Sequence, residues 1–333
     1  MATRRSALLS GMARAAELHA ELGLRERLKS GDRPVDVFGA IRAQRVTVLF
    51  RPLDGLLGAY VPTPRSAGIL ITTLRDHHVQ RFTAAHELGH HILGHRVPSL
   101  DRQVGFVARG EREGFDPQEI EADAFAAEFL LPKWLIVAHA RRRKWGKADL
   151  RRTDVVYQLS LRLGASYSAT CWALATAELV SPEIARGLAD RPPKEAKQRA
   201  ISGVTPSSWY ADVWVLSEHD RGTQLLGNPE DLFVFNLREH AAGGYEWDVE
   251  SMPKAGLSVR RDERVDDDGV AMGGTVQRQV IAQGNGLKVG RLALSERRPW
   301  EGRAEPLNTF EVDLALLGKE PVGLPRPERL LAA

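Results

Sequence analysis

The sequence changes character at two adjacent prolines, Pro192 and Pro193, and this change limits the fold more than any other feature. Before them, apolar residues mostly recur at helical spacing, whereas after them apolar and polar residues alternate. Two prolines in a row end a helix. A chain of 333 residues is long enough for two or three domains. We therefore expect separate units joined by a linker over residues 191–208.

The part before the prolines combines helices with a few short strands. Helical spacing is found at residues 5–28, 35–42, 79–93 and 117–131, and in shorter segments up to about residue 188. Short β-rich runs separated by Gly and Pro lie at 46–50, 57–60 and 68–72. The pattern predicts an α+β domain with a small antiparallel sheet over residues 1–145, followed by a helical segment over 146–190.

The part after the prolines is predicted to be all-β. Alternating runs between Gly, Pro and Asp turns lie at 213–216, 231–237, 245–249, 275–281, 288–294 and 309–315. This pattern is typical of a β-sandwich, placed at 209–320 with a tail at 321–333. Since each part has apolar residues for a core of its own, we expect a chain cut after about Arg199 to keep its first half folded.

The composition fits a soluble globular protein, with 43% hydrophobic and 27% charged residues. Cys171 is the single cysteine, so no internal disulfide is expected. The N-terminal residues lack the apolar run of a signal peptide or membrane span. We therefore expect a cytoplasmic protein without a membrane segment. The net charge of +3 gives only weak support for nucleic-acid binding.

The strongest chemical signal is the segment His86-Glu-Leu-Gly-His90, which lies in a stretch with helical spacing. Histidines four positions apart share a helix face, where their ring nitrogens can bind one zinc ion. Glu87 lies where a carboxylate can take a proton from a water on the metal. The alternative is a chance match on a histidine-rich helix. A third ligand elsewhere in the sequence would favour a zinc site over a chance match, and the site would then hold one zinc ion per chain.

The sequence offers two sources for that third ligand. In one known spacing a glycine and a histidine follow the motif, but Gly94 and His95 are each one residue out of register. A later helix offers Glu119, with Asp123 one turn further along the same face and Glu121 pointing elsewhere. We therefore predict Glu119 as the third ligand and Asp123 as a residue that orients a ligand histidine. Surface or packing positions are expected for His77, His78, His91 and His95.

Residues 81–90 and 119–132 together closely resemble the ImmA/IrrE family of bacterial metallopeptidases, and the resemblance covers about residues 1–188. It implies a zinc-dependent endopeptidase of the gluzincin type. In that family the residues matching His86, His90 and Glu119 are zinc ligands, and the residue matching Glu87 is the general base. Members typically cleave a helix-turn-helix transcriptional repressor, which releases a stress-response or mobile-element operon. The oxyanion-stabilising residue stays open among Tyr60, His91 and His95.

Residues 154–179 read as a helix, a turn at Gly164 and a second helix, which resembles the helix-turn-helix-like segment of this family. A helix that reads DNA needs Arg, Lys, Asn or Gln at its exposed N-terminal positions. Residues 166–175 are apolar or hydroxylic instead. DNA binding is therefore not favoured, although the basic residues at 141–144 and 151–152 leave phosphate contacts open.

The C-terminal part resembles the chagasin-like cysteine-protease inhibitors over about residues 211–317. These proteins are Ig-type sandwiches that present three binding loops at one end. The matching loop residues here are Gly244, Tyr245, Gly273, Gly274, Arg298, Pro299 and Trp300. The resemblance implies a protein partner, either a papain-like protease or a sensor. Trp300 is the predicted exposed anchor, whereas Trp247 is expected in the core.

The sequence thus predicts a multidomain protein with an α+β gluzincin-like metallopeptidase, a helix-turn-helix-like extension and an all-β Ig-like sandwich. Its predicted function is zinc-dependent cleavage of a repressor, with the sandwich as a partner-binding or regulatory module. One alternative is a non-catalytic regulator, which the presence of Glu87 argues against. The other is a protease inhibitor fused to a structural metalloprotein.

Overall fold

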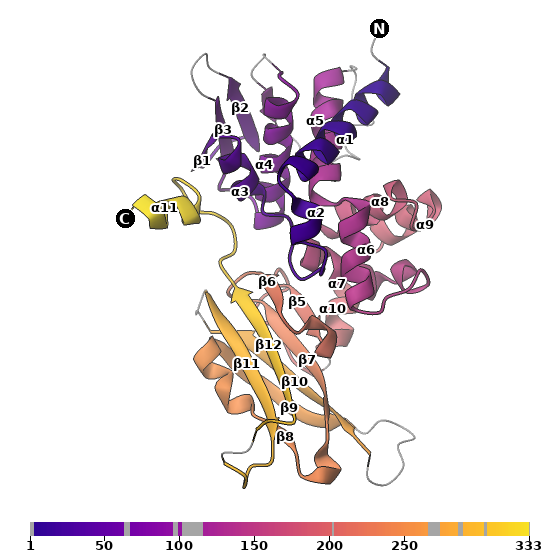
Figure 1. Cartoon of the computed structure of the whole chain (residues 1–333), viewed down its shortest axis with the longest axis vertical. Helices are drawn as coiled ribbons and strands as arrows, with labels where there is room; N and C mark the ends of the chain where they lie inside the picture. Colours follow the sequence, from indigo (N-terminus) through magenta and orange to yellow (C-terminus); the bar gives the residue numbers. More distant parts are fainter. Residues whose placement is uncertain are drawn as a thin grey trace.

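The computed structural model describes residues 3–62, 67–95, 99–101, 116–201, 203–265, 274–285, 289–302 and 305–332. A mainly helical part lies above a part made of β-sheet in Figure 1. The helices are α1 (Arg4–Glu21), α2 (Leu24–Arg27), α3 (Val37–Ala43), α4 (His77–Ile92), α5 (Pro117–Leu130), α6 (Lys133–Arg142), α7 (Thr153–Leu163), α8 (Tyr167–Thr176), α9 (Pro182–Ala189), α10 (Lys194–Ala200) and α11 (Arg326–Ala332). The strands are β1 (Thr47–Arg51), β2 (Gly58–Pro62), β3 (Ala67–Thr72), β4 (Ser99–Asp101), β5 (Val213–Leu216), β6 (Thr223–Leu226), β7 (Leu232–Glu239), β8 (Glu246–Trp247), β9 (Leu257–Val265), β10 (Val276–Gly284), β11 (Val289–Arg297) and β12 (Asn308–Ala315).

The sheet of the helical part is mixed, so the expectation of a fully antiparallel sheet is wrong. Its strand order is β1-β3-β2-β4, with β1 parallel to β3 and β2 antiparallel to β3 and β4. The cause is that β2 and β3 form a hairpin, so β3 runs in the direction of β1 and pairs with it along its other edge. Ile69 and Ile71 of β3 are buried in the core that also contains Leu88 of α4.

Two glycines let the central helices pack closely. A Cβ atom at Gly89 of α4 would lie 3.1 Å from Phe125 Cδ1 and 3.2 Å from Ala122 Cα on α5. A Cβ atom at Gly11 of α1 would collide with the backbone oxygen of Glu121. Helix α5 is therefore held between α1 and α4 at a distance that larger residues would not allow.

The C-terminal part consists of two four-stranded sheets that share one apolar core. Their strand orders are β5-β7-β10-β9 and β6-β12-β11-β8. The core contains Trp214 and Phe235 from the first sheet and Leu292 and Phe310 from the second. The sequence did not predict β9, because this edge strand is largely exposed and its charged residues hide the alternation.

The two parts share buried side chains, and the folding of the first half without the sandwich stays a prediction. Tyr157 and Leu161 of α7 belong to the apolar core of the sandwich. The Tyr157 hydroxyl also donates to Asp212 Oδ1 at 2.9 Å and accepts from the backbone N–H of Val213 at 2.9 Å. Removal of the sandwich would expose these groups. The segment 191–208, expected to be a linker, also contains helix α10.

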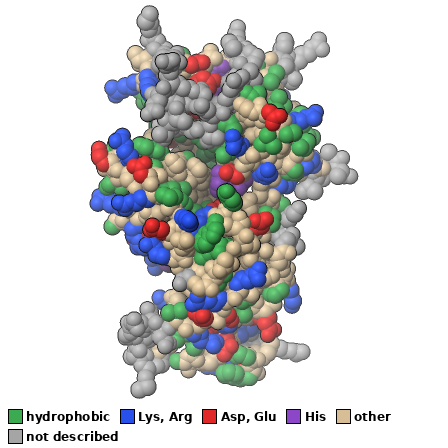
Figure 2. Space-filling view, turned by 180° about the vertical axis from the view of Figure 1, so that it is seen from behind, with side chains coloured by type: hydrophobic (Ala, Val, Ile, Leu, Met, Phe, Trp, Pro, Cys, Tyr) green, Lys and Arg blue, Asp and Glu red, His purple; other side chains and the backbone are tan. Residues whose placement is uncertain are grey.

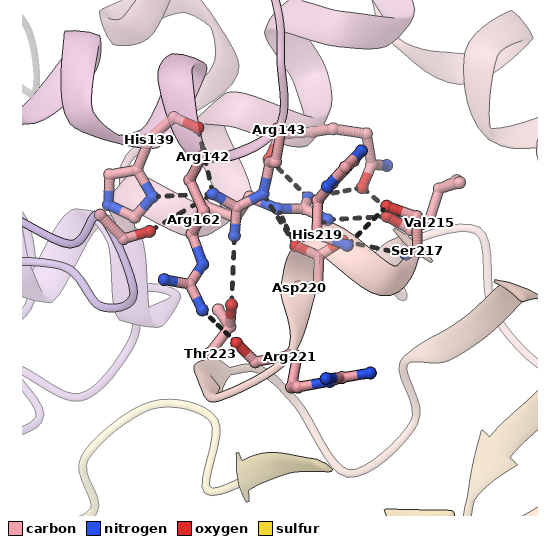
Figure 3. Close-up of polar contacts among 12 residues, drawn as sticks. His139, Arg142, Arg143, Arg162, Val215, Ser217, His219, Asp220, Arg221 and Thr223 are labelled. Carbon is pink, nitrogen blue, oxygen red and sulfur yellow. Dashed lines mark hydrogen bonds and ion pairs between the residues drawn. The ribbon is translucent and has the colours of Figure 1, made fainter. Parts of the chain in front are cut away.

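A buried polar cluster completes this interface (Figure 3). Arg143, just after α6, donates from Nε to Asp220 Oδ1 at 2.8 Å, and Arg162 of α7 donates to the same oxygen at 3.0 Å. Arg162 also donates to the backbone oxygen of Val215 in β5 at 2.7 Å. Burial alone would raise the pKa of Asp220, but the two arginines hold it at about 2. The cluster therefore contains a carboxylate that is shared by two cations.

The C-terminal segment returns to the helical part, where α11 lies beside its sheet in Figure 1. Gly323 and Phe50 of β1 form a backbone bridge with N–O distances of 2.8 and 3.0 Å. Gln80 of α4 exchanges hydrogen bonds with the backbone of Glu320. The predicted tail, residues 321–333, thus contains a contact to the first sheet. Within the described residues, no helix combines the length and apolar character that a membrane crossing requires.

Candidate metal centre

Helix α4 carries both histidines of the motif. Its N-cap is Asp76, whose side chain accepts a hydrogen bond from the backbone N–H of Val79 at 2.9 Å. His86 and His90 are one turn apart and buried, and their Nε2 atoms are 3.1 Å apart. The helix therefore points both nitrogens at the same place.

Glu119 reaches this place from the first turn of α5. Its Oε2 lies 3.6 Å from His86 Nε2, and its Oε1 lies 3.5 Å from His90 Nε2. Among the described residues, these three form the one set of three or more His, Cys, Asp or Glu side chains whose possible ligand atoms all lie within 4.8 Å of one another. The close contact between α4 and α5 at Gly89 makes this approach feasible.

The distances within this group fit a zinc ion. Two atoms bound to one tetrahedral zinc at about 2.0–2.1 Å lie about 3.3 Å apart. The two histidine nitrogens are 3.1 Å apart, and each lies 3.5 to 3.6 Å from one oxygen of the Glu119 carboxylate, His86 from Oε2 and His90 from Oε1. Two imidazole nitrogens and a carboxylate are also a donor set that zinc enzymes use. The residues present therefore fit the metal in both distance and chemistry.

Asp123 lies directly behind His86. Its Oδ1 is 2.9 Å from His86 Nδ1, and the Asp123 side chain is 6% exposed. An imidazole that faces the ligand group through Nε2 carries its proton on Nδ1, where a carboxylate can accept it. The arrangement fixes both the orientation and the tautomer of His86.

His95, for which the sequence predicts a surface or packing position, lies behind His90. Its Nδ1 is 2.8 Å from His90 Nδ1, and its Nε2 is 3.0 Å from Glu121 Oε2. His95 is buried, because the chain folds back after the end of α4. Sequence spacing did not reveal this contact, since it depends on the geometry of the turn at Gly94.

Glu87 is buried beneath strand β2. A Cβ atom at Gly58 of β2 would lie 2.9 Å from Glu87 Oε1 and would collide with Thr83 Cγ2. The absence of a side chain at Gly58 therefore leaves the space that the Glu87 carboxylate needs. The sequence analysis did not single out Gly58, whose role depends on the approach of β2 to α4.

Of the three oxyanion candidates, two are bonded to each other. The Tyr60 hydroxyl is 3.1 Å from His91 Nδ1. Burial raises the pKa of Tyr60 and lowers the pKa of His91. The tyrosine ring also stacks on His90, with ring centroids 6.4 Å apart. The third candidate, His95, already contacts His90 and Glu121.

The sandwich loops bring several of the predicted binding residues together. Arg298 donates from Nε to the backbone oxygen of Gly243 at 2.9 Å, and its guanidinium lies 4.6 Å from the centre of the Tyr245 ring. Gly244 has φ of +75° and packs against the ring of Trp300, which is 70% exposed. Trp247, by contrast, is buried as the sequence predicts.

The remaining loop residues are placed by the strands. Pro299 lies in the turn that contains Trp300, after β11. Gly274 precedes β10, whose first residue Val276 pairs with Glu239 at the end of β7. This pairing places Gly274 at the same end of the sandwich as the other loops. The predicted Gly273 lies outside the described residues.

Charge on the molecular surface is mixed. On the face shown in Figure 2, blue and red side chains are interspersed over both parts of the molecule. Two of the basic residues at 141–144 and 151–152 have acidic partners: Arg143 pairs with Asp220 at 2.8 Å, and Arg152 pairs with Asp154 at 2.6 Å. This arrangement adds no support for a DNA-binding surface.

Solved structures give weak matches. The cysteine protease inhibitor EhICP2 from Entamoeba histolytica is 22% identical, with 32% of this chain and 96% of that chain covered and a TM-score of 0.28. Amebosin is 25% identical, with coverages of 31% and 94% and a TM-score of 0.25. A Mycobacterium tuberculosis transcriptional regulator is 14% identical, with coverages of 83% and 76% and a TM-score of 0.29.

The comparison with protein families gives a defined match. No curated protein matches the chain. The IrrE N-terminal-like domain of the Peptidase_M78 family matches residues 41–174, a range that contains α4, α5 and the ligand group described above. Residues 41–174 of this chain are therefore similar to the IrrE N-terminal-like domain of the Peptidase_M78 family.

Proposed function

We propose that this protein is a zinc-dependent endopeptidase with His86, His90 and Glu119 as the metal ligands. The observation that carries the proposal is the convergence of two histidine nitrogens 3.1 Å apart with the Glu119 carboxylate, whose oxygens lie 3.5 to 3.6 Å from them, and with a glutamate next to the first histidine. The match to a peptidase family supports the same conclusion. One zinc ion per chain is the expected content.

Each residue of the centre has a chemical task in this proposal. Zinc bound there would lower the pKa of a water molecule and polarise the scissile carbonyl. Glu87 accepts the proton of the attacking water on its carboxylate and passes it to the leaving amine. Asp123 keeps the His86 proton on Nδ1, so that Nε2 stays available as a ligand.

The Tyr60–His91 pair is the proposed oxyanion stabiliser. It lies against the ring of His90, and both side chains carry hydrogen-bond donors. His95 is less suitable for this task, because both of its ring nitrogens already have partners in His90 and Glu121. Tyr60→Phe should therefore slow cleavage while zinc content is unchanged.

We further propose that the substrate is a helix-turn-helix transcriptional repressor in the cytoplasm, and that its cleavage switches on a stress-response or mobile-element operon. This assignment rests on the resemblance to the ImmA/IrrE family. The match of residues 41–174 to the IrrE N-terminal-like domain supports it.

The test is cleavage of helix-turn-helix repressors, including any repressor encoded next to this protein, by the wild type and by Glu87→Gln. The variant should keep its zinc and its fold but lose several orders of magnitude in rate, because an amide cannot accept the water proton. Glu128→Gln, on α5 but outside the ligand group, is the matched control and should cleave normally. Normal cleavage by Glu87→Gln would contradict the proposed mechanism.

A second candidate function concerns the sandwich loops. The contacts of Arg298 with Tyr245 and of Trp300 with Gly244 fix an exposed aromatic group at one end of the sandwich. Exposed aromatic anchors often dominate protein interfaces. We propose that this end binds a protein, either a papain-like protease or a regulatory partner.

Inhibition of papain by the full-length protein separates these two partner classes. If the partner is a protease, papain should be inhibited and Trp300→Ala should weaken inhibition at least tenfold. If the partner is regulatory, papain should stay active and Trp300→Ala should change repressor cleavage in cell extract but not with purified components. No effect of Trp300→Ala in either assay would remove the proposed role of this end.

A further inference from the structure

We infer that His95 and Glu121 form a hydrogen-bonded relay that positions the metal ligand His90 and tightens zinc binding. This inference rests on the proposed function, since it assigns a supporting role around the same metal centre. It goes beyond the predicted ligand set, in which the sequence placed neither residue. The relevant contacts are His90 Nδ1 to His95 Nδ1 at 2.8 Å and His95 Nε2 to Glu121 Oε2 at 3.0 Å.

The backbone after α4 brings His95 back to His90. The N–H of His95 donates to the backbone oxygen of His90 at 3.0 Å, and the N–H of Gly94 donates to that of His91 at 3.1 Å. Gly94 has φ of +72°, a left-handed conformation that favours glycine. These are the two hydrogen bonds of a Schellman motif, which closes the C-terminal end of a helix. The same turn places the imidazole of His95 edge-on to that of His90, with ring centroids 4.9 Å apart and an interplanar angle of 68°.

Metal binding fixes the direction of every hydrogen bond in the relay. His90 directs Nε2 toward the ligand group, so its proton is on Nδ1 and is donated to His95 Nδ1. His95 then accepts at Nδ1 and carries a proton on Nε2. This N–H donates to the Glu121 carboxylate. In the two hydrogen bonds of this relay, each ring nitrogen thus either donates or accepts, and no two N–H groups point at each other.

Helix α5 therefore supports both ligand histidines as well as supplying Glu119. Asp123 accepts from the Nδ1 side of His86, and Glu121 acts on His90 through His95. Glu121 is bonded to His95 Nε2, the nitrogen on the side of the ring away from His90, so its effect on His90 passes through the His95 ring. Hydrogen bonds of this kind orient a ligand and raise its basicity. His95 and Glu121 are accordingly positioning residues and not metal ligands.

The test is zinc affinity, measured by competition with a chromophoric chelator for the full-length protein. His95→Phe keeps the ring but removes both nitrogens, and should weaken zinc binding about 10- to 100-fold. Glu121→Leu should weaken it in the same direction but less. The double variant should resemble His95→Phe alone, because Glu121 acts through His95. Glu121→Gln keeps an acceptor oxygen and should restore most of the affinity lost in Glu121→Leu.

Two controls make the outcome specific. Glu128→Leu changes another partly buried glutamate of α5 and should leave zinc affinity unchanged. Nitrogen-15 NMR of the zinc-loaded wild type needs no variant and should show the His95 proton on Nε2. A proton on Nδ1, or affinity of folded His95→Phe within twofold of the wild type, would overturn the relay. Failure of the wild type to bind zinc, or full binding by His86→Ala, would instead overturn the proposed metal site.

Discussion

At the scale of single residues, the space around Glu87 depends on a position without a side chain. A methyl group at Gly58 would meet Thr83 and the Glu87 carboxylate. Gly58→Ala should therefore displace Glu87, lower the rate of cleavage about 10- to 100-fold and cost about 1–3 kcal/mol of stability. Cleavage assays and urea unfolding give the two values.

Gly68→Ala is the matched control for this prediction. It lies in the neighbouring strand β3, where the added Cβ atom would have one neighbour, the backbone oxygen of Thr47 at 3.9 Å. Cleavage by this variant should be within about twofold of the wild type. Equal losses in the two variants would show that the sheet tolerates no added methyl group and that Gly58 has no special relation to Glu87.

Glu128 gives a prediction about pH. Burial raises the pKa of its carboxyl to about 7, above the value of about 4.3 expected in the unfolded chain. Between these values the folded protein holds a proton that the unfolded chain has released, so the free energy of unfolding falls as pH rises through this window.

Glu128→Gln should therefore raise the free energy of unfolding at pH 8 by about 1–2 kcal/mol and leave it unchanged near pH 4.5. Urea unfolding at both pH values measures the difference. Glu21→Gln, at an exposed position of α1, should have no such effect. A benefit from Glu128→Gln that is equal at both pH values would contradict the assigned cause.

The sequence predicted those parts of the candidate site that depend only on spacing within a single helix. His86 and His90 share a face because of their spacing, and Glu119 and Asp123 share a face of α5 for the same reason. His95 could not be predicted, because its contact with His90 depends on the turn at Gly94. A glycine followed by a histidine directly after the helix was the available signal.

At the scale of elements, the ligand group depends on how closely α5 approaches α4. Gly89 provides that approach, since its Cβ atom would lie 3.1 Å from Phe125 Cδ1. Gly89→Val should push α5 and its Glu119 away from the histidines and weaken zinc binding at least tenfold. Gly187→Val in α9, where an added Cβ atom has no neighbour within 4 Å, is the control. Unchanged zinc affinity in Gly89→Val would contradict this explanation.

Most helices and strands followed from local pattern, whereas their pairing did not. The β-rich runs at 46–50 and 68–72 predicted strands, but the parallel pairing of β1 with β3 depends on the hairpin that β3 forms with β2. Helix α7 was predicted from its spacing. The spacing did not show that Tyr157 and Leu161 of this helix pack into the core of the sandwich.

At the scale of the whole molecule, the helical part and the sandwich should unfold together. Asp220 neutralises part of the charge of two buried arginines across their interface (Figure 3). Asp220→Asn keeps the shape but leaves Arg143 and Arg162 without a negative partner, and should cost about 3–5 kcal/mol. Glu311→Gln breaks the exposed pair with Arg291 and should cost at most about 1 kcal/mol.

Urea unfolding followed by circular dichroism and by tryptophan fluorescence tests this prediction. A single transition at the same midpoint for both signals is expected, in the wild type and in Asp220→Asn. Two separated transitions, or a cost for Asp220→Asn no larger than for Glu311→Gln, would mean that the interface is not a shared core. The linker and separate cores expected from the two prolines would then describe the protein better.

The most direct test of the central claim is the zinc content of purified protein, measured by mass spectrometry beside the protein concentration. The wild type and Glu128→Ala should each contain one zinc ion per chain, whereas Glu119→Ala should contain far less after dialysis against a weak chelator. The fold of each variant is checked by circular dichroism. A wild type without zinc, or a Glu119→Ala variant that keeps a full zinc ion, would contradict the metal centre on which the proposed peptidase depends.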